Sequence, residues 1–442
     1  FEVNSNSNFL ISRVTQDLFE GNSYIGFLST IYNDSTMTHY VNSVDMLSYF
    51  WDSQLVMDWQ LINSQTGKSG NGLSFEINYN PTENNLYSWI DFEYFDENFN
   101  INDVGYLYRN NLKKVQGGLG FYWPELDLSL PILESRVNLN FNKMSNLDDL
   151  VLNNSMGLSS SVTFNNLWFL GGGFNYLAEY NDDLILFNYH GTEDKEDKLG
   201  PPIMIPKGTA TDFYLGNDPH EKYSFNSSIS FWENDFEKGR SQSISFGVHS
   251  SEYMNFNFEY SPTISEEKFR WLEAYGSVPE YIFAASHNQS QKFIYEMNYN
   301  HNRKISIQLY AEYITSTNDY GQFYKYDPDK MEYALIDFSS YYISYDELIA
   351  ENFVDDMVRP ISPQYYVKYY TKDHILNLNL VLNYEFRPGS NVYMVYSVYR
   401  DVVGKEMDDF TEFLKYIPSD ADLAEVNFTQ SLYLKIDYWF DF

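Results

Sequence analysis

Acidic, basic and amide side chains recur at every second position of several segments, and these residues are the best placed for chemistry. Each alternates with an apolar residue, so a β-strand would project them all from one face. On a sheet that encloses a lumen, such residues either tune a pore or fill a closed lumen with ion pairs. The candidates for the lumen face are Asn377, Asn379, Asn383, Glu385, Arg387, Glu296, Glu312, Lys435 and Asp437.

A second group of candidates lies in the segment INDVGYLYRN, residues 101–110. One interpretation is an extracellular loop that contacts a ligand. The other is a turn whose Asn, Asp and Gly residues serve backbone geometry alone. The residues concerned are Asn102, Asp103, Gly105, Arg109 and Asn110.

The acidic segment GTEDKEDK, residues 191–198, raises the question of a calcium or lipopolysaccharide-bridging site. It lacks the ligand spacing and the turn glycine of a calcium loop, and a solvated acidic loop fits the pattern better. The chain contains no HExxH, GxSxG or phosphate-binding loop motif. It also has no cysteine, which excludes disulfides and thiolate-bound zinc. We therefore predict no catalytic residue, no metal site and no cofactor.

The charge of the chain limits its partners. Sixty-two acidic residues stand against 28 basic ones, which gives a net charge of −34. A field of this sign repels nucleic acid, so we expect no nucleic-acid partner. Outer-membrane lipid or lipopolysaccharide is the expected partner, together with other outer-membrane or surface proteins in a complex.

Alternating segments of roughly ten residues must position these side chains, and they recur along the whole chain. In ILNLNLVLNYEF, residues 375–386, leucine alternates with asparagine before a Pro-Gly turn. Expected strands fall at 9–14, 25–32, 54–62, 72–80, 87–95, 115–123, 132–142, 157–164, 168–180, 211–217, 223–232, 243–250, 253–261, 293–300, 305–314, the two runs of 375–400, and 431–442.

The connections between these segments differ in length. Tight turns are expected at 80–85, 217–222, 299–304 and 386–391, and long acidic loops at 181–208, 262–285, 317–362 and 401–428. This asymmetry is typical of outer-membrane barrels, with the turns on the periplasmic side. A soluble sandwich would need a very large pair of sheets to use so many two-faced strands.

The predicted fold is therefore all-β: a transmembrane antiparallel β-barrel of the Gram-negative outer membrane. We expect roughly 18 strands, within a range of 16–22. Residues 1–442 should form a single barrel domain that is the C-terminal part of a larger protein. Aromatic residues at strand ends, such as Tyr384 and Phe386, are typical of an interfacial girdle.

Several segments resemble a family of Gram-negative outer-membrane proteins, the domain-of-unknown-function 5916 family. These segments are 84–123, 281–288, 305–323 and 383–397, and the loop residues of 102–110 match best. The resemblance covers the chain from about Phe9 to Phe442 and implies a long barrel. Family members also carry a sandwich similar to carbohydrate-binding family nine, which no residue here matches, so carbohydrate binding is not carried over. The resemblance implies no established activity.

The sequence thus predicts a non-enzymatic outer-membrane barrel, either a pore or the membrane subunit of a larger assembly. One alternative is a barrel enzyme, such as a protease or lipid acylhydrolase, which needs a catalytic cluster near the rim. Another is the C-terminal barrel of a TonB-dependent transporter, which needs a plug domain upstream.

Overall fold

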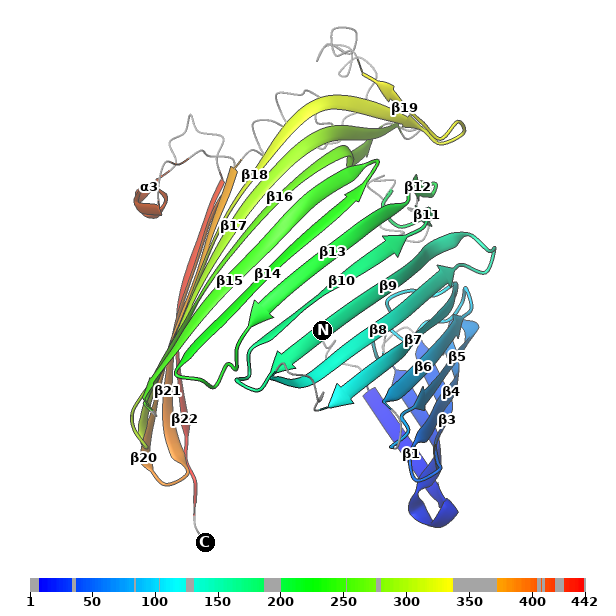
Figure 1. Cartoon of the computed structure of the whole chain (residues 1–442), viewed down its shortest axis with the longest axis horizontal. Coiled ribbons are helices and arrows are strands. Elements are labelled where there is room, and N and C mark those ends of the chain that lie inside the picture. The colour runs from blue at the N-terminus through cyan, green and yellow to red at the C-terminus, as the bar shows by residue number, and fades with distance from the viewer. Residues whose placement is uncertain are drawn as a thin grey trace. The chain divides into compact units, whose positions relative to one another are not determined.

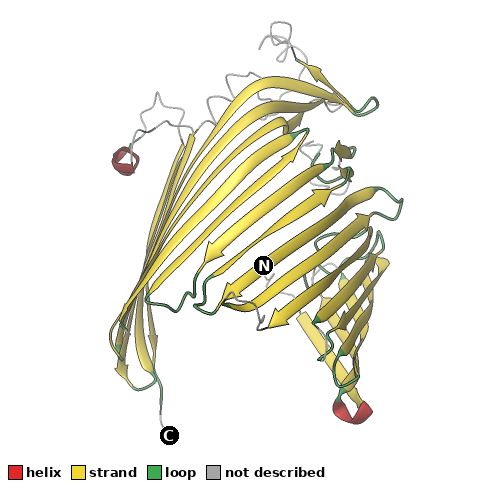
Figure 2. Cartoon of the chain, in the orientation of Figure 1, coloured by secondary structure: helices red, strands yellow, loops and turns green. Residues whose placement is uncertain are grey.

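A computed structural model describes residues 8–33, 37–82, 85–102, 104–124, 131–186, 200–251, 253–275, 280–336, 372–403, 407, 410–417 and 425–440. Most of these residues are in β-strands, as Figure 2 shows. Contacts divide the chain into two compact units. The first comprises Phe1–Asn165, Gly171–Asp183 and Met204–Thr209, and the second comprises Asn166–Leu170, Leu184–Ile203 and Ala210–Phe442.

The first unit contains an antiparallel series of strands in which each strand pairs with the next along the chain. Its strands are β1 (Asn8–Leu18), β2 (Ser23–Asn33), β3 (Thr38–Phe50), β4 (Leu55–Thr66), β5 (Lys68–Tyr79), β6 (Leu86–Phe95), β7 (Leu112–Pro124), β8 (Ile132–Ser145) and β9 (Val151–Phe164). A short 3-10 turn, η1 (Phe19–Gly21), joins the first two strands. Four shorter strands follow on the segments that the two units share: β10 (Phe169–Leu177), β11 (Tyr180–Asp182), β12 (Ile203–Ile205) and β13 (Gly208–Gly216).

The second unit repeats the same arrangement with longer strands (Figure 1). They are β14 (Tyr223–Asn234), β15 (Glu237–Ser251), β16 (Met254–Tyr275), β17 (Glu280–Asn302), β18 (Ile305–Asp327), β19 (Glu332–Leu335), β20 (Lys372–Arg387), β21 (Ser390–Val403) and β22 (Glu425–Asp437). Strand β18 pairs with β17, β19 and β20. A short helix of six residues, α3 (Phe410–Lys415), precedes β22.

These pairings confirm the predicted all-β, antiparallel fold. Twenty strands belong to the large sheet among the described residues, which is within the predicted range and above the expected 18. In this described part of the chain the sheet is not closed. The tight turn predicted at 386–391 is present, because Arg387 pairs with Ser390 and Gly389 has a φ of 76°.

The long loop predicted at 262–285 is wrong over most of its length, and the one predicted at 317–362 is wrong in its first part. Strands β16 and β17 occupy most of 262–285, and β18 continues to Asp327. These three strands have 22, 23 and 23 residues, about twice the ~9–11 residues that a tilted strand needs to cross a membrane. A strand at Thr38–Phe50 was also not predicted.

We name one region of these strands the distal extension. It consists of residues 261–275 of β16, 280–292 of β17 and 314–327 of β18, together with β19. Its core consists of fully buried apolar side chains: Ile282, Ala284 and Phe323, with Ile336 beside them. On the other face, Phe283 (1% exposed) lies in an aromatic cluster in which the rings of Phe269 and Tyr333 stack at 3.8 Å. Burial raises the pKa of Tyr333 well above its usual value.

Candidate solute-facing surface

Cross-strand register shows that eight of the nine predicted lumen candidates share one face of the second unit. Directly opposed residues of an antiparallel pair project from the same side. Glu296 pairs with Tyr310, which pairs with Asn379. Glu312 pairs with Asn377 in the same way. On the last strands, Asn383 and Lys435 both pair with Tyr393, and Glu385 and Asp437 both pair with Asn391. The register shifts after Glu385, so Arg387 pairs with Ser390 at the turn and is not placed on this face by the register.

Most of these side chains bind one another or nearby polar groups. Asn379 donates to Oδ1 of Asn377 at 3.3 Å and accepts from Ser397 at 2.6 Å. Lys435 and Asp437 form an ion pair at 2.9 Å. Arg387 donates to the hydroxyl of Tyr438, and Glu385 accepts the backbone N–H of Gly389 at the turn. The surface is therefore a hydrogen-bonded polar lining with both signs of charge.

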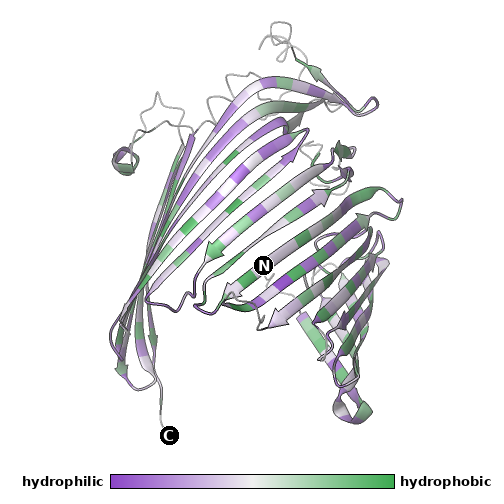
Figure 3. Cartoon of the chain, in the orientation of Figure 1, coloured by the Kyte–Doolittle hydropathy of each residue, from purple (hydrophilic) through white to green (hydrophobic). Residues whose placement is uncertain are grey.

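The opposite face of the same strands is apolar. Leu376, Leu378, Leu380 and Leu382 pair with Tyr313, Ala311, Leu309 and Ile307 of β18. Large apolar side chains on this face are exposed, among them Ile244 (45%), Phe246 (45%), Phe258 (44%) and Leu432 (65%). Tyr260, Phe293 and Tyr313 form a row of neighbouring rings where the apolar side chains end. We name the exposed apolar face between this row and Tyr384 the apolar band. Figure 3 shows hydrophobic and hydrophilic residues alternating along the strands.

The first unit carries acidic residues on its polar face that the sequence analysis missed. Asp58, Glu76 and Asp91 oppose one another directly across β4, β5 and β6, and we name them the carboxylate row. Lys114 lies 3.7 Å from Asp91 and 3.3 Å from Glu93. Each residue alternates with apolar neighbours in its own strand, so a prediction of the hairpin registers could have found the row.

Small residues and aromatic rings shape the rest of this polar face. Gly118 and Gly120 of β7 leave room for the rings of Trp89 and Tyr87, which lie directly over them. The hydroxyl of Tyr87 donates to Oδ1 of Asn138. A cavity of about 590 Å³ opens beside these rings, lined also by Tyr122, Arg136, Val56 and several Asn and Ser side chains.

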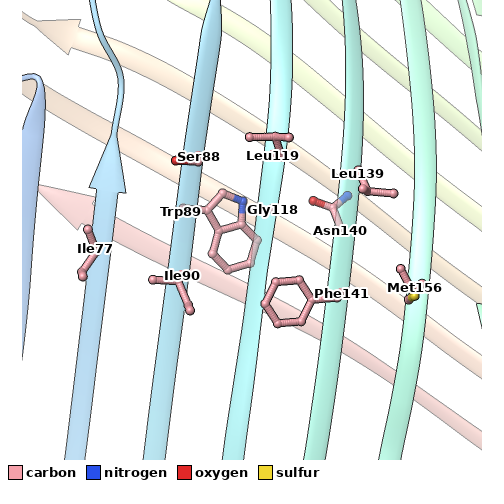
Figure 4. A pocket seen from close by; sticks show the side chains of 10 residues that line it. All are labelled: Ile77, Ser88, Trp89, Ile90, Gly118, Leu119, Leu139, Asn140, Phe141 and Met156. Carbon is pink, nitrogen blue, oxygen red and sulfur yellow. The ribbon is translucent and has the colours of Figure 1, made fainter.

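The apolar face of the first unit has a shallow hollow (Figure 4). Ile77 pairs with Ile90, which pairs with Gly117, and Phe141 follows in the same row before Met156. Because Gly117 has no side chain, the ring of Phe141 leans over it. The result is a cavity of about 390 Å³ with mostly apolar walls, open to the surroundings of the sheet.

The loop candidates bind groups within the loop and fasten it to a neighbouring segment. Arg109 makes a two-pronged ion pair with Asp183, at 2.8 and 3.1 Å, and its side chain is only 10% exposed. Oδ1 of Asn102 accepts the N–H of Leu107, and Asn110 donates to the carbonyl of Glu97. Gly105 lies beside Ile101, and Asp103 is outside the described residues. These contacts favour the structural reading, whereas ligand contact stays a prediction.

Another cavity, of about 610 Å³, lies at the base of the distal extension. The pairing of β17 with both of its neighbours is irregular here. On β16 the register shifts between Glu267 and Arg270, and on β18 it shifts opposite Ala285. Asn288 donates to Glu267 and accepts from Arg270 at 2.8 Å. Burial raises the pKa of Glu267, with the Arg270 guanidinium opposing that shift. Such paired irregularities re-aim side chains.

The described residues contain neither a metal-binding cluster nor a membrane-spanning helix. Within the described ranges, no group of three His, Asp or Glu side chains is arranged to hold a metal ion. The acidic segment 191–198 is outside those ranges. No helix in the described part of the chain is both long and apolar enough to span a membrane.

A long antiparallel meander with one polar face and one exposed apolar face defines the outer-membrane barrel class of all-β folds. More particularly, the chain belongs to the family described as Domain of unknown function (DUF5916), whose model matches residues 2–442. No curated protein matches the sequence.

Three solved structures illustrate the similarity of fold. The FrpB iron transporter from Neisseria meningitidis is 10% identical with a TM-score of 0.49, over 98% of this chain and 72% of that one. The siderophore receptor PirA from Acinetobacter baumannii is 8% identical with a TM-score of 0.42, over 100% and 75%. OmpT, an outer membrane protein of Vibrio cholerae, is 10% identical with a TM-score of 0.31, over 75% and 92%. At such scores these structures say nothing about function.

Proposed function

We propose that this chain forms the wall of a non-enzymatic β-barrel in the Gram-negative outer membrane, and that its polar face lines a path for solutes. The observation that carries the proposal is the apolar band. Burying a Leu or Phe side chain away from water is favourable by about 1.5–3 kcal/mol. Leaving many of them exposed on one face of a folded sheet is therefore costly in water and favourable in lipid.

The dimensions of the apolar band support a membrane. From Leu376 to Tyr384 the apolar parity spans about nine residues, which matches the ~9–11 residues of a tilted transmembrane strand. Aromatic residues lie near both ends, with Tyr313 beside Leu376 and with Tyr384 and Phe386 at the turn. Outer-membrane barrels carry such girdles at both interfaces.

The carboxylate row gives the proposed path a charge preference. Three carboxylates that oppose one another on adjacent strands repel anions and attract cations, and Lys114 offsets part of that charge. We therefore expect a cation-preferring pore.

The alternative role is that of the membrane subunit of a larger outer-membrane assembly. It would depend on the same apolar band and the same fold.

Planar-bilayer recording of the purified, refolded chain tests the proposal. We expect stepwise conductance with a reversal potential that favours cations and that declines toward neutrality at high salt. Migration on gels that changes on heating checks, independently, that a barrel has formed. A heat-modifiable barrel without conductance would remove the pore and leave the assembly role, for which copurification from native membranes is the corresponding measurement.

A further inference from the structure

Helix α3 lies against the edge of the apolar band. Its Phe413 is fully buried and packs against Val402, with Tyr313 and Leu376 beside it. Register places all three of these strand residues on the apolar face, since Tyr313 pairs with Leu376 and Val402 pairs with His374, two residues away. The helix therefore covers the face that we assign to lipid, at the row where the band ends.

The helix also covers the basic group at that edge. Arg400 pairs with Leu376 and so projects from the apolar face. Its guanidinium lies over the ring of Phe413 at 5.4 Å and donates to the carbonyl oxygen of Tyr416. A charged group at the rim of a lipid-facing surface normally reaches for polar partners. Here the helix supplies those partners within the chain.

The outward side of the same segment is apolar and uncovered. Phe410 is 42% exposed, Leu414 is 45% exposed and Ile417, which follows the helix, is 84% exposed. Phe410 and Leu414 are four residues apart and lie on one line of the helix, and Ile417 follows two residues after its end. Thr411, Glu412 and Lys415 are the exposed polar residues of the helix, and Phe413 is its buried residue. Apolar residues on one side and polar residues on the other are typical of a helix at a membrane interface.

We infer that α3 is an interfacial anchor, whose Phe410, Leu414 and Ile417 insert into the boundary between the headgroups and acyl chains of the membrane. This inference rests on the proposed function, because the depth of the helix is set by the apolar band beside it. The occupant is lipid because the ring of Phe410 lies 4.8 Å from the ring of Tyr313, which ties the exposed apolar side chains to the edge of the apolar band. The anchor would fix how deeply β20, β21 and β22 sit in the bilayer.

The absence of cysteine from the chain allows a direct test. Single variants Ile417→Cys, Leu378→Cys and Asn379→Cys carry an environment-sensitive fluorophore, and the full chain is refolded into phosphatidylcholine vesicles that contain nitroxide-labelled lipids. We expect shallow nitroxides to quench the label at 417 by roughly half and deep nitroxides to quench it less, as for an interfacial residue. The label at Leu378 should show the reverse order.

The three positions separate the possible failures. If the label at Leu378 is quenched and the label at 417 emits as in water, the anchor is overturned while the barrel stands. If the label at Leu378 is not quenched, the proposed membrane function itself fails. Deep quenching at 417 would overturn an interfacial position in favour of a fully inserted one. Asn379→Cys, on the opposite face of the same strand, reports any general loss of folding through its gel migration.

Discussion

Strands β16, β17 and β18 pass through two regions whose apolar side chains meet opposite surroundings. In the apolar band, Phe258 is 44% exposed and faces away from the chain. In the distal extension, Phe283 is 1% exposed and Ile282 and Ala284 are fully buried. The same backbone pairing thus runs through a lipid-like environment and then through a protein core. The comparison shows that the hydropathy pattern along these strands depends on what each face contacts, and not on the secondary structure alone.

Truncation of a buried ring tests this comparison with the largest expected effect. Phe283→Ala should destabilise the distal extension by about 3–5 kcal/mol, the cost typical of a cavity in a packed core. Phe258→Ala is the matched control, since the ring it removes has few protein contacts to lose. Urea titration of the refolded chain, followed by hydrogen exchange in the two regions, measures both. Equal losses at the two positions would contradict the division into core and band.

A charge placed on the apolar band tests its assignment to lipid. Leu380→Arg should destabilise the refolded protein by about 2–4 kcal/mol, as an arginine near the bilayer midplane does. Asn379→Arg, one residue earlier on the polar face, should cost less, about 1 kcal/mol, for the hydrogen bonds that Asn379 makes with Asn377 and Ser397. The measurement is equilibrium unfolding from vesicles. If Leu380→Arg causes little loss of stability, this face contacts water or protein and not lipid.

The carboxylate row gives a smaller effect, in selectivity and not in stability. Neutralising it with Asp58→Asn, Glu76→Gln and Asp91→Asn should reduce cation preference several-fold, since Coulomb attraction inside a partly shielded lumen is stronger than in water. Lys114→Gln is the opposite control and should raise the preference. Reversal potentials in a salt gradient measure both, and unchanged potentials would place the ion path elsewhere.

The sequence alone predicted the strands of the apolar band but missed those of the distal extension, and the reasons are physical. In 375–386 one face belongs to the apolar band, which we assign to lipid, and the other face is polar, so leucine and asparagine alternate clearly. In 262–275 the strand continues beyond that contrast, and the segment PTISEEKFRWLEAY reads as an acidic loop. Irregular pairing near Arg270 also breaks the alternation of faces. A period of two identifies strands only where their two faces meet different solvents.

The candidate residues follow the same rule. Register placed eight of the nine predicted polar residues on one face because each belongs to a strand with clear alternation, whereas Arg387 lies beyond the register shift at the turn. The carboxylate row was missed because it depends on which residues oppose one another across three strands, and no single strand carries that information. Helix α3 was missed because six residues are too few to show a helical period, and its apolar line lies within a segment expected to be a loop.

Alkaline pH should distinguish the two regions with the smallest change to the protein. Burial raises the pKa of Tyr333, and burial together with Asp327 raises the pKa of Tyr326. An acid whose folded pKa lies above its unfolded value of about 10 stabilises the fold below pH 10 and loses that contribution as pH rises toward the folded pKa. The distal extension should therefore lose hydrogen-exchange protection above about pH 10.

Replacing the hydroxyl isolates this effect. The Tyr333 hydroxyl is buried without a hydrogen-bond partner among the described residues, so Tyr333→Phe should change stability at neutral pH by less than about 0.5 kcal/mol or raise it slightly. The variant should also keep more of its protection at high pH, while protection of the apolar band stays the same in both proteins. An equal alkaline loss in the variant would show that Tyr333 does not control the pH response, and would turn attention to Tyr326 beside it, whose ring lies 4.9 Å away.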